Sequence, residues 1–136
     1  MKNILFFLLF ATSISGCTKS EESATTEINM QNLSGNYKIT SATVNGVDIL
    51  SVYLPPCQAD DIYTLNADGT YTITDAGTAC TPSSATSGTW ALSGSQITIG
   101  TQVFTLVSFD GAKITATSSV TQAGTTVTVT VVFTKQ

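Results

Sequence analysis

Residues 57–80 read CQADDIYTLNADGTYTITDAGTAC, the pattern of a β-hairpin with a cysteine at each end. Apolar and polar residues alternate in Asp61–Leu65 and again in Thr70–Thr74, around an Asn-Ala-Asp-Gly turn. An Asp-Gly pair between two alternating runs is a strong short-range hairpin signal. Residue numbers paired across such a turn add up to about 135, and those of Cys57 and Cys80 add up to 137. We therefore predict that the two thiols lie opposite each other and form a disulfide.

The composition is that of one small β domain. The chain has 136 residues, of which 42% are hydrophobic and only 10% are charged, and Thr, Ser and Gly dominate the remainder. This length suffices for one modest core, and β-branched Thr suits the solvated face of a strand. The net charge of −4, in a chain with neither Arg nor His, argues against nucleic acid or an anionic membrane surface as a partner.

Residues 1–16 have the features of a secretory signal peptide, with a basic start, a compact apolar run and small residues at the end. The apolar run is shorter than the roughly 20 residues that span a bilayer. The sequence Ile14-Ser-Gly-Cys17 resembles the bacterial lipobox. This resemblance implies that Cys17 becomes the first residue and carries fatty acyl chains, palmitate among them, which anchor the chain to a membrane. An ordinary signal peptide followed by an unrelated cysteine is the alternative.

Residues 17–31 are interpreted as the lipidated Cys17 and a flexible tether, because they are polar and have no periodic apolar face. The cluster Lys19–Glu22 resembles the acidic tags of some surface-exposed lipoproteins of Gram-negative bacteria. We expect an outer-membrane lipoprotein whose folded domain, residues 32–136, occupies either the periplasmic or the cell-surface face. This assignment leaves the other two cysteines as a pair in an oxidising compartment.

The folded domain is predicted to be all-β. Almost every connection is a tight turn, so strands adjacent in sequence should be adjacent in space. No stretch has helical spacing strong enough to cover a sheet, and one-sided strands must therefore bury their apolar faces against each other. Closure into an eight-stranded antiparallel up-and-down β-barrel achieves this and leaves no free edge. The eight predicted strands are 36–44, 60–66, 69–75, 86–93, 95–99, 102–109, 112–119 and 125–134.

The apolar positions of these strands supply the candidate interior. In 102–109 the alternation assigns Phe109 to the face of Val103 and Val107, opposite Phe104 and Leu106. The full set of candidate interior residues is Tyr37, Ile39, Tyr63, Leu65, Tyr71, Ile73, Trp90, Leu92, Ile97, Ile99, Phe109, Ile114, Val127, Val129 and Val131.

Three groups of residues, taken in order, resemble the bacterial lipocalin-like domain found in many small lipoproteins. They are Leu-Ser-Gly-Asn-Tyr at 33–37, the hairpin at 57–80 with its two cysteines, and Gly-Thr-Trp-Ala-Leu at 88–92. The resemblance covers about residues 32–136 and implies a calycin-type barrel in which Tyr37 packs across the closed end. Lipocalins also carry an Arg near the last strand that packs on this aromatic residue, and the chain contains no Arg.

Catalysis is not expected. The chain has no His, and its three cysteines are assigned to the lipid and the disulfide, so no nucleophile–base pair remains. Adjacent Asp60 and Asp61 point to opposite faces of a strand. A calcium site formed by these two residues and Asp75 is a weaker interpretation than solvated charges, because the acidic residues lack the spacing of a calcium loop. We predict no catalytic residue, no cofactor and no metal.

Two functional hypotheses of different classes follow. An eight-stranded barrel is just wide enough either to be filled by side chains or to hold one small ligand. In the first hypothesis the barrel binds a small hydrophobic molecule, lined by Tyr37, Tyr63, Tyr71 and Trp90. In the second it is a packed interaction module whose loops, Ser51–Cys57 and Ala76–Ala85, contact an envelope protein or a host surface. The sequence identifies no protein partner.

Overall fold

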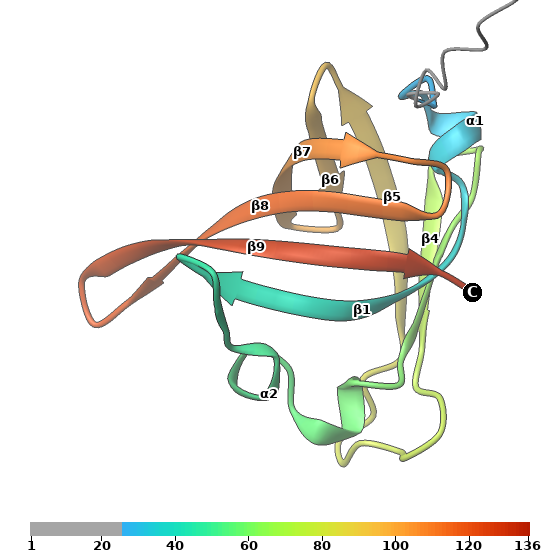
Figure 1. Ribbon diagram of the computed structural model, residues 1–136. Coiled ribbons are helices and arrows are strands. Elements are labelled where there is room, and N and C mark those ends of the chain that lie inside the picture. Colours follow the sequence, from blue (N-terminus) through green and yellow to red (C-terminus); the bar gives the residue numbers. More distant parts are fainter. Residues whose placement is uncertain (1–25) are drawn as a thin grey trace, which may run out of the picture.

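The computed structural model describes residues 26–136, so the predicted signal peptide, Cys17 and most of the predicted tether lie outside the described residues. Within this range nine strands form one antiparallel sheet, and eight of them close into a barrel because β1 pairs with β9 (Figure 1). The strands are β1 (Gly35–Val44), β2 (Val47–Asp48), β3 (Ile62–Leu65), β4 (Thr70–Thr74), β5 (Thr86–Ser93), β6 (Gln96–Ile99), β7 (Gln102–Phe109), β8 (Lys113–Gln122) and β9 (Thr125–Lys135).

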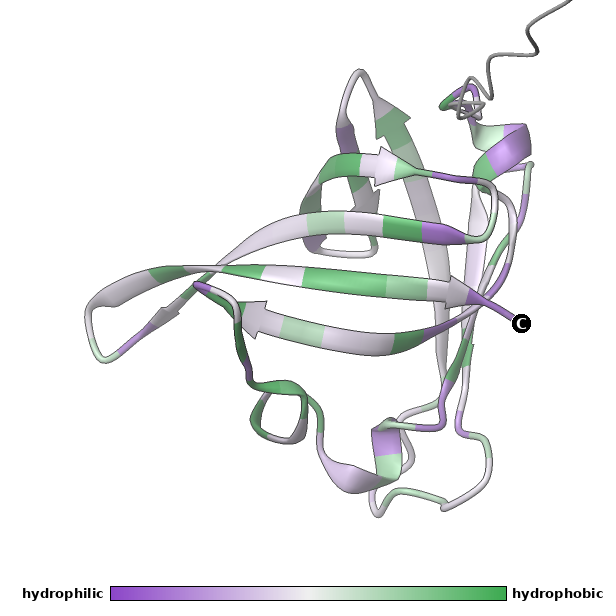
Figure 2. Cartoon of the chain, in the orientation of Figure 1, coloured by the Kyte–Doolittle hydropathy of each residue, from purple (hydrophilic) through white to green (hydrophobic). Residues whose placement is uncertain are grey.

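The predicted all-β barrel is confirmed, and each predicted strand is present within a few residues of its expected bounds. The short strand β2 pairs with the far end of β1 and is additional to the eight. Along the barrel strands apolar and polar residues alternate, as the banding of β9 in Figure 2 shows. Apolar side chains face the interior, and the polar face that alternates with them meets solvent.

The hairpin of β3 and β4 has the predicted strand pairing and the predicted disulfide. The pairs run from Ile62↔Thr74 to Leu65↔Tyr71, with residue numbers that add up to 136 in each pair. Cys57 and Cys80 lie just beyond this ladder, 5.2 Å apart between Cα atoms, and form the disulfide. The disulfide therefore closes the open mouth of the hairpin, as the sequence predicts.

One strand differs from the predicted alternation. In β7 the residues Phe104, Leu106 and Phe109 are buried together, whereas Val103 and Val107 are exposed. The register of β7 against β8 shifts between Leu106 and Ser108, which marks a β-bulge at Val107. A bulge inserts one extra residue into a strand and so exchanges the two faces beyond it. The assignment of Phe109 to the face of Val103 and Val107 was therefore wrong.

Short helical segments occupy the two ends of the barrel. Helix α1 (Met30–Leu33) lies at the end that also holds the C-terminus, which we call the closed end (Figure 1). At the other, open end, helix α2 (Leu50–Tyr53) and the 3₁₀ turn η1 (Pro56–Gln58) replace most of the loop predicted for Ser51–Cys57. The side chain of Asp48 starts α2 by accepting a hydrogen bond of 2.9 Å from the Leu50 amide.

At the closed end, hydrogen bonds and a lysine side chain hold the neighbouring segments together. The Tyr37 hydroxyl donates to the Leu33 carbonyl of α1 at 2.8 Å, and Trp90 is buried beneath the turn that joins β3 to β4. Lys135 Nζ lies 5.7 Å from the centre of the Tyr37 ring and 6.0 Å from that of Phe109. A lysine thus packs on the aromatic residue where lipocalins use an arginine.

The open end is built differently. Strand β1 pairs with β3 only over Gly35–Tyr37, and its far end turns into β2. The chain then crosses the mouth as α2, tied to β1 by the Ile49 amide, which donates to the Ala42 carbonyl at 2.8 Å. On the opposite side β8 and β9 continue as a two-stranded arm (Ser118–Val129), beyond their pairing with β7 and β1 (Figure 1).

Candidate functional site

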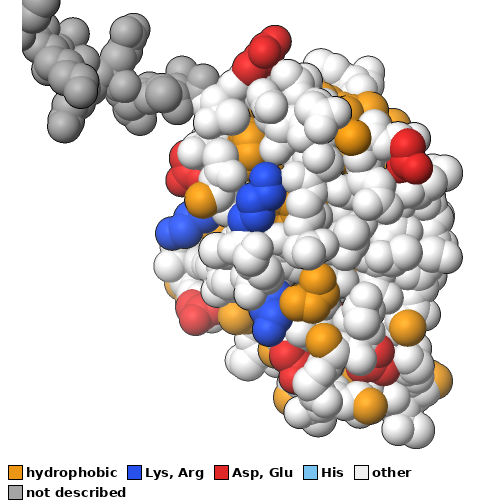
Figure 3. All heavy atoms as spheres, turned by 90° about the vertical axis from the view of Figure 1, so that its right-hand side faces the viewer, with side chains coloured by type: hydrophobic (Ala, Val, Ile, Leu, Met, Phe, Trp, Pro, Cys, Tyr) orange, Lys and Arg blue, Asp and Glu red, His pale blue; other side chains and the backbone are white. Residues whose placement is uncertain are grey.

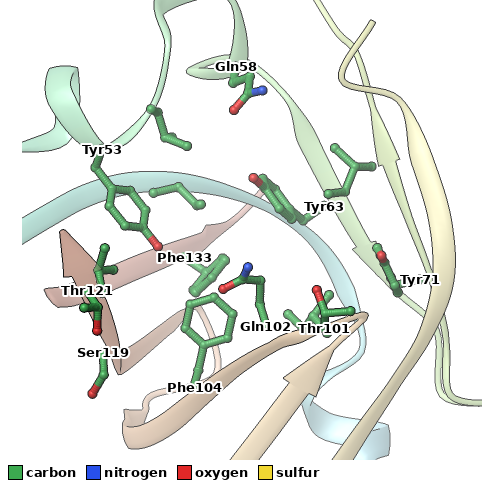
Figure 4. Close-up of a pocket in the computed structure, with 15 residues that line it drawn as sticks. Tyr53, Gln58, Tyr63, Tyr71, Thr101, Gln102, Phe104, Ser119, Thr121 and Phe133 are labelled. Atoms are coloured by element: carbon green, nitrogen blue, oxygen red, sulfur yellow. The ribbon is translucent and has the colours of Figure 1, made fainter. Parts of the chain in front are cut away.

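A pocket of about 600 Å³ opens at this end of the barrel. Tyr53 of helix α2 and the following residue Leu54 line one side, and the β8–β9 arm provides Val120 on the other. The turn between β6 and β7 contributes Thr101 and Gln102 to the rim. The pocket is therefore enclosed by three segments that the barrel brings together from distant parts of the sequence (Figure 4).

Three aromatic rings form the floor. Phe133 lies edge-on to Phe104, with ring centres 5.5 Å apart, and edge-on to Tyr63, with ring centres 5.9 Å apart. Below them, between Tyr37, Leu65 and their neighbours, the remaining void is about 10 Å³. A void of this size holds at most about one water molecule. The barrel is therefore a cup, open above the aromatic floor and filled beneath it.

The rim carries uncharged polar groups. In Figure 4 the side chains of Tyr53 and Gln102 point into the cavity from opposite sides. Among residues 26–136, the hydroxyls of Tyr53 and Tyr63 and the side-chain amide of Gln102 make no hydrogen bond to another side chain or backbone group. The pocket thus offers hydrogen-bond donors and acceptors to an occupant above an apolar floor, the usual composition of a small-molecule site.

Tyr63 remains a neutral donor over a wide pH range. Burial, and to a smaller extent the charge of Asp61 and the neighbouring Tyr53, raises the pKa of Tyr63 from 10.0 to about 12. Asp61 itself is only 2% exposed, and its Oδ1 has no hydrogen-bond partner in the described part of the chain. Asp61 does not line the pocket, so its charge acts on the floor from outside the cavity.

The four residues predicted to line a ligand divide into two groups. Tyr63 and Tyr71 line the pocket. Tyr37 and Trp90 do not, because they lie at the closed end with their polar atoms bonded to backbone carbonyls. These two side chains therefore lie away from this pocket, since alternation shows which face a residue occupies but not its height in the barrel.

Several residues that line the pocket were not predicted from the sequence. Tyr53 lies in a segment next to Pro55 and Pro56 that was read as a loop, and its position over the mouth depends on α2. Phe104 was assigned to the outer face because the bulge at Val107 is not visible in the pattern. Val127, predicted to be interior, is exposed because it belongs to the β8–β9 arm beyond the barrel.

The acidic residues near the disulfide hold the adjacent loop in place by accepting hydrogen bonds. The Asp60 carboxylate accepts from the Thr78 amide at 2.8 Å, and Asp75 accepts from the Cys80 amide at 3.0 Å and the Ser83 hydroxyl at 2.7 Å. These bonds lower the pKa of Asp75, with the Ser83 hydroxyl as the largest cause. Within residues 26–136 no three Asp, Glu, Cys or His side chains come together in a way that could hold a metal ion.

Comparison with known proteins gives one match. The family model described as a lipocalin-like domain matches residues 33–131. Searches of the curated proteins and of the solved structures gave no significant match. In the described range, 26–136, no helix is long and apolar enough to cross a membrane.

Proposed function

Because the chain belongs to the lipocalin-like domain family, we propose that it binds a small hydrophobic molecule in the pocket at the open end of its barrel. The observation that carries this proposal is the cup itself, with three aromatic rings as its floor and uncharged hydroxyl and amide groups at its rim. Its volume of about 600 Å³ falls within the range of small-molecule sites, about 300 to 1,000 Å³. The chain acts here by binding and not by catalysis.

The proposal is tested by native mass spectrometry of the chain purified from its own cells with the disulfide intact. A small-molecule adduct that dissociates on organic extraction is the expected result. A Val120→Trp variant, which fills the pocket from the β8–β9 arm, should lose the adduct. Val103→Trp is the matched control, because Val103 is exposed on the outer face of β7. A bare mass for the wild-type chain, together with no binding across a panel of lipophilic compounds, would contradict the proposal.

We further propose that Cys17 carries the lipid that anchors the protein to the outer membrane. Helix α1, through which the chain enters the barrel, lies at the closed end, so an anchor on that side leaves the pocket mouth unobstructed. Metabolic labelling with a palmitate analogue should label the wild-type chain and not a Cys17→Ser variant. Protease treatment of intact cells then distinguishes the two faces, since only a surface-exposed domain is accessible to the protease.

A second candidate function is contact with an envelope or host protein through the loops at the open end. The observation in its favour is that Val52 of α2 is 84% exposed and Val47 of the preceding strand β2 is 65% exposed. Cross-linking in intact cells should then capture a partner, and a Val47→Ser, Val52→Ser double variant should reduce the yield. An unchanged yield would exclude these loops as the contact.

A further inference from the structure

The pocket contains no charged side chain. Its lining includes tyrosines, glutamines, threonines and a serine beside apolar residues, and no Asp, Glu or Lys. Tyrosine, glutamine and threonine are uncharged at neutral pH and form hydrogen bonds to neutral groups. A charged group inside the cavity would therefore lose its hydration without gaining a counter-ion, and an unpaired buried charge is strongly unfavourable.

The lysines of the described chain lie elsewhere. Lys135 packs over Tyr37 at the closed end, and Lys113 begins β8 at that same end. Lys38 alternates with the buried Tyr37 and Ile39 on β1 and so faces outward. Figure 3 shows lysine side chains on the right-hand face of Figure 1, the side on which α1 and the C-terminus lie. No cation of the described residues can thus reach an anion held in the cup.

The nearest buried charge is negative. Asp61 is close enough to Tyr63 to act on the ionisation of its hydroxyl, and its carboxylate is almost fully buried. Electrostatic interactions are weakly screened by solvent at such a site. The negative potential of this carboxylate at the aromatic floor adds to the penalty for an anionic occupant. The same carboxylate does not line the cavity, so it offers a cation no direct contact.

We propose that the pocket selects an uncharged amphipathic molecule, with an apolar or aromatic body on the Phe104–Phe133–Tyr63 floor and a hydroxyl, carbonyl or amide group at the Tyr53–Gln102 rim. Free fatty acids and other lipophilic anions are excluded by charge and not by size. This inference rests on the proposed ligand-binding function and narrows it to one chemical class.

Two fluorescent probes with the same ring skeleton test this inference. N-phenyl-1-naphthylamine is neutral, and 8-anilino-1-naphthalenesulfonate adds one sulfonate. The neutral probe should bind to the purified chain at least about tenfold more tightly than the sulfonate probe, because the sulfonate would enter the pocket without a counter-ion. Equal or tighter binding of the sulfonate at the pocket would overturn the inference and leave ligand binding standing. Failure of both probes to bind would instead overturn the proposed function, and with it the inference.

A charge introduced at the rim makes the test specific. Gln102 is exposed at the pocket mouth, so Gln102→Lys should fold normally and place a cation in the cavity. We expect the ratio of the sulfonate affinity to the neutral-probe affinity to rise about tenfold in this variant, because the added cation attracts only the charged probe. Gln96→Lys, with the same charge at the start of β6 and outside the pocket lining, should leave both affinities unchanged. Equal gains in the two variants would show a net-charge effect and contradict selection within the pocket.

Discussion

The indole Nε1 of Trp90 donates a hydrogen bond of 2.7 Å to the backbone carbonyl of Asn66, 24 residues earlier in the chain. The Trp90 amide also donates to the Gly69 carbonyl at 2.8 Å, so one residue of β5 holds both ends of the turn between β3 and β4. The only tryptophan of the chain is therefore a structural residue of the closed end, and its fluorescence reports folding and not occupancy of the pocket.

A Trp90→Phe variant should unfold more easily and bind ligand normally. Loss of the indole hydrogen bond costs about 1 kcal/mol, and the smaller ring leaves a cavity that adds about 1–2 kcal/mol. Urea unfolding followed by circular dichroism measures the change. A variant of wild-type stability with weakened ligand affinity would place Trp90 in the binding site and contradict this assignment.

Lys135 should stabilise the closed end through the rings of Tyr37 and Phe109. Replacement by Met keeps most of the aliphatic stem and removes the cation, which we expect to cost about 0.5–1 kcal/mol of unfolding free energy. Lys113→Met is the matched control, because Lys113 is exposed and its cation is not placed over either ring. Equal effects of the two substitutions would show that net charge, and not the ring contact, is responsible.

The disulfide should contribute about 3 kcal/mol, because it closes a loop of about two dozen residues in the unfolded chain. A double Cys57→Ser, Cys80→Ser variant tests this value by chemical denaturation. The wild-type protein in reductant should show a similar loss, and the double variant should be insensitive to reductant. Equal free energies of unfolding for the oxidised and the reduced wild type would show that the disulfide does not stabilise the fold.

Stability should decrease in acid partly because of Asp75. Its pKa in the folded protein is lowered from 3.8 by hydrogen bonds from the Ser83 hydroxyl and the Cys80 and Ser84 amides. A lowered pKa stabilises the fold above the unfolded-state value, and this contribution disappears as the pH falls through the folded-state pKa. Asp75→Asn should therefore be less stable than wild type at pH 7, and the difference should disappear as the pH falls from the unfolded-state pKa through the lower folded-state pKa. Parallel stability curves from pH 7 to pH 2 would exclude this role.

The general fold follows from local sequence patterns. The alternation of Thr and Val in 125–134 and the Asp-Gly turn at 68–69 determine strands and hairpins without reference to distant residues. The pairing of Cys57 with Cys80 can be predicted from their residue numbers for the same reason, because a short turn fixes the register of the two strands that it joins. Antiparallel meanders are well suited to such reasoning, since neighbours in sequence are neighbours in space.

The pocket depends on features that local patterns do not contain. The bulge at Val107 exchanges the faces of β7 and thereby buries Phe109 with Phe104 and Leu106. Helix α2 brings Tyr53 over the mouth only because the chain is tied to β1 at one side and to the disulfide at the other. Both are tertiary effects that local patterns do not contain, and of the four residues predicted to line a ligand only Tyr63 and Tyr71 lie at this pocket.

The cup above Phe133 is proposed to hold a ligand, and the affinity of a neutral lipophilic probe for two variants tests this claim. Val120 is half-buried and lines the pocket from the β8–β9 arm, outside the closed part of the barrel, so Val120→Trp should fill the cup without unfolding the protein. We predict that this variant binds N-phenyl-1-naphthylamine at least about tenfold more weakly than wild type. Val103→Trp should bind like wild type. A folded Val120→Trp variant with wild-type affinity would contradict the claim.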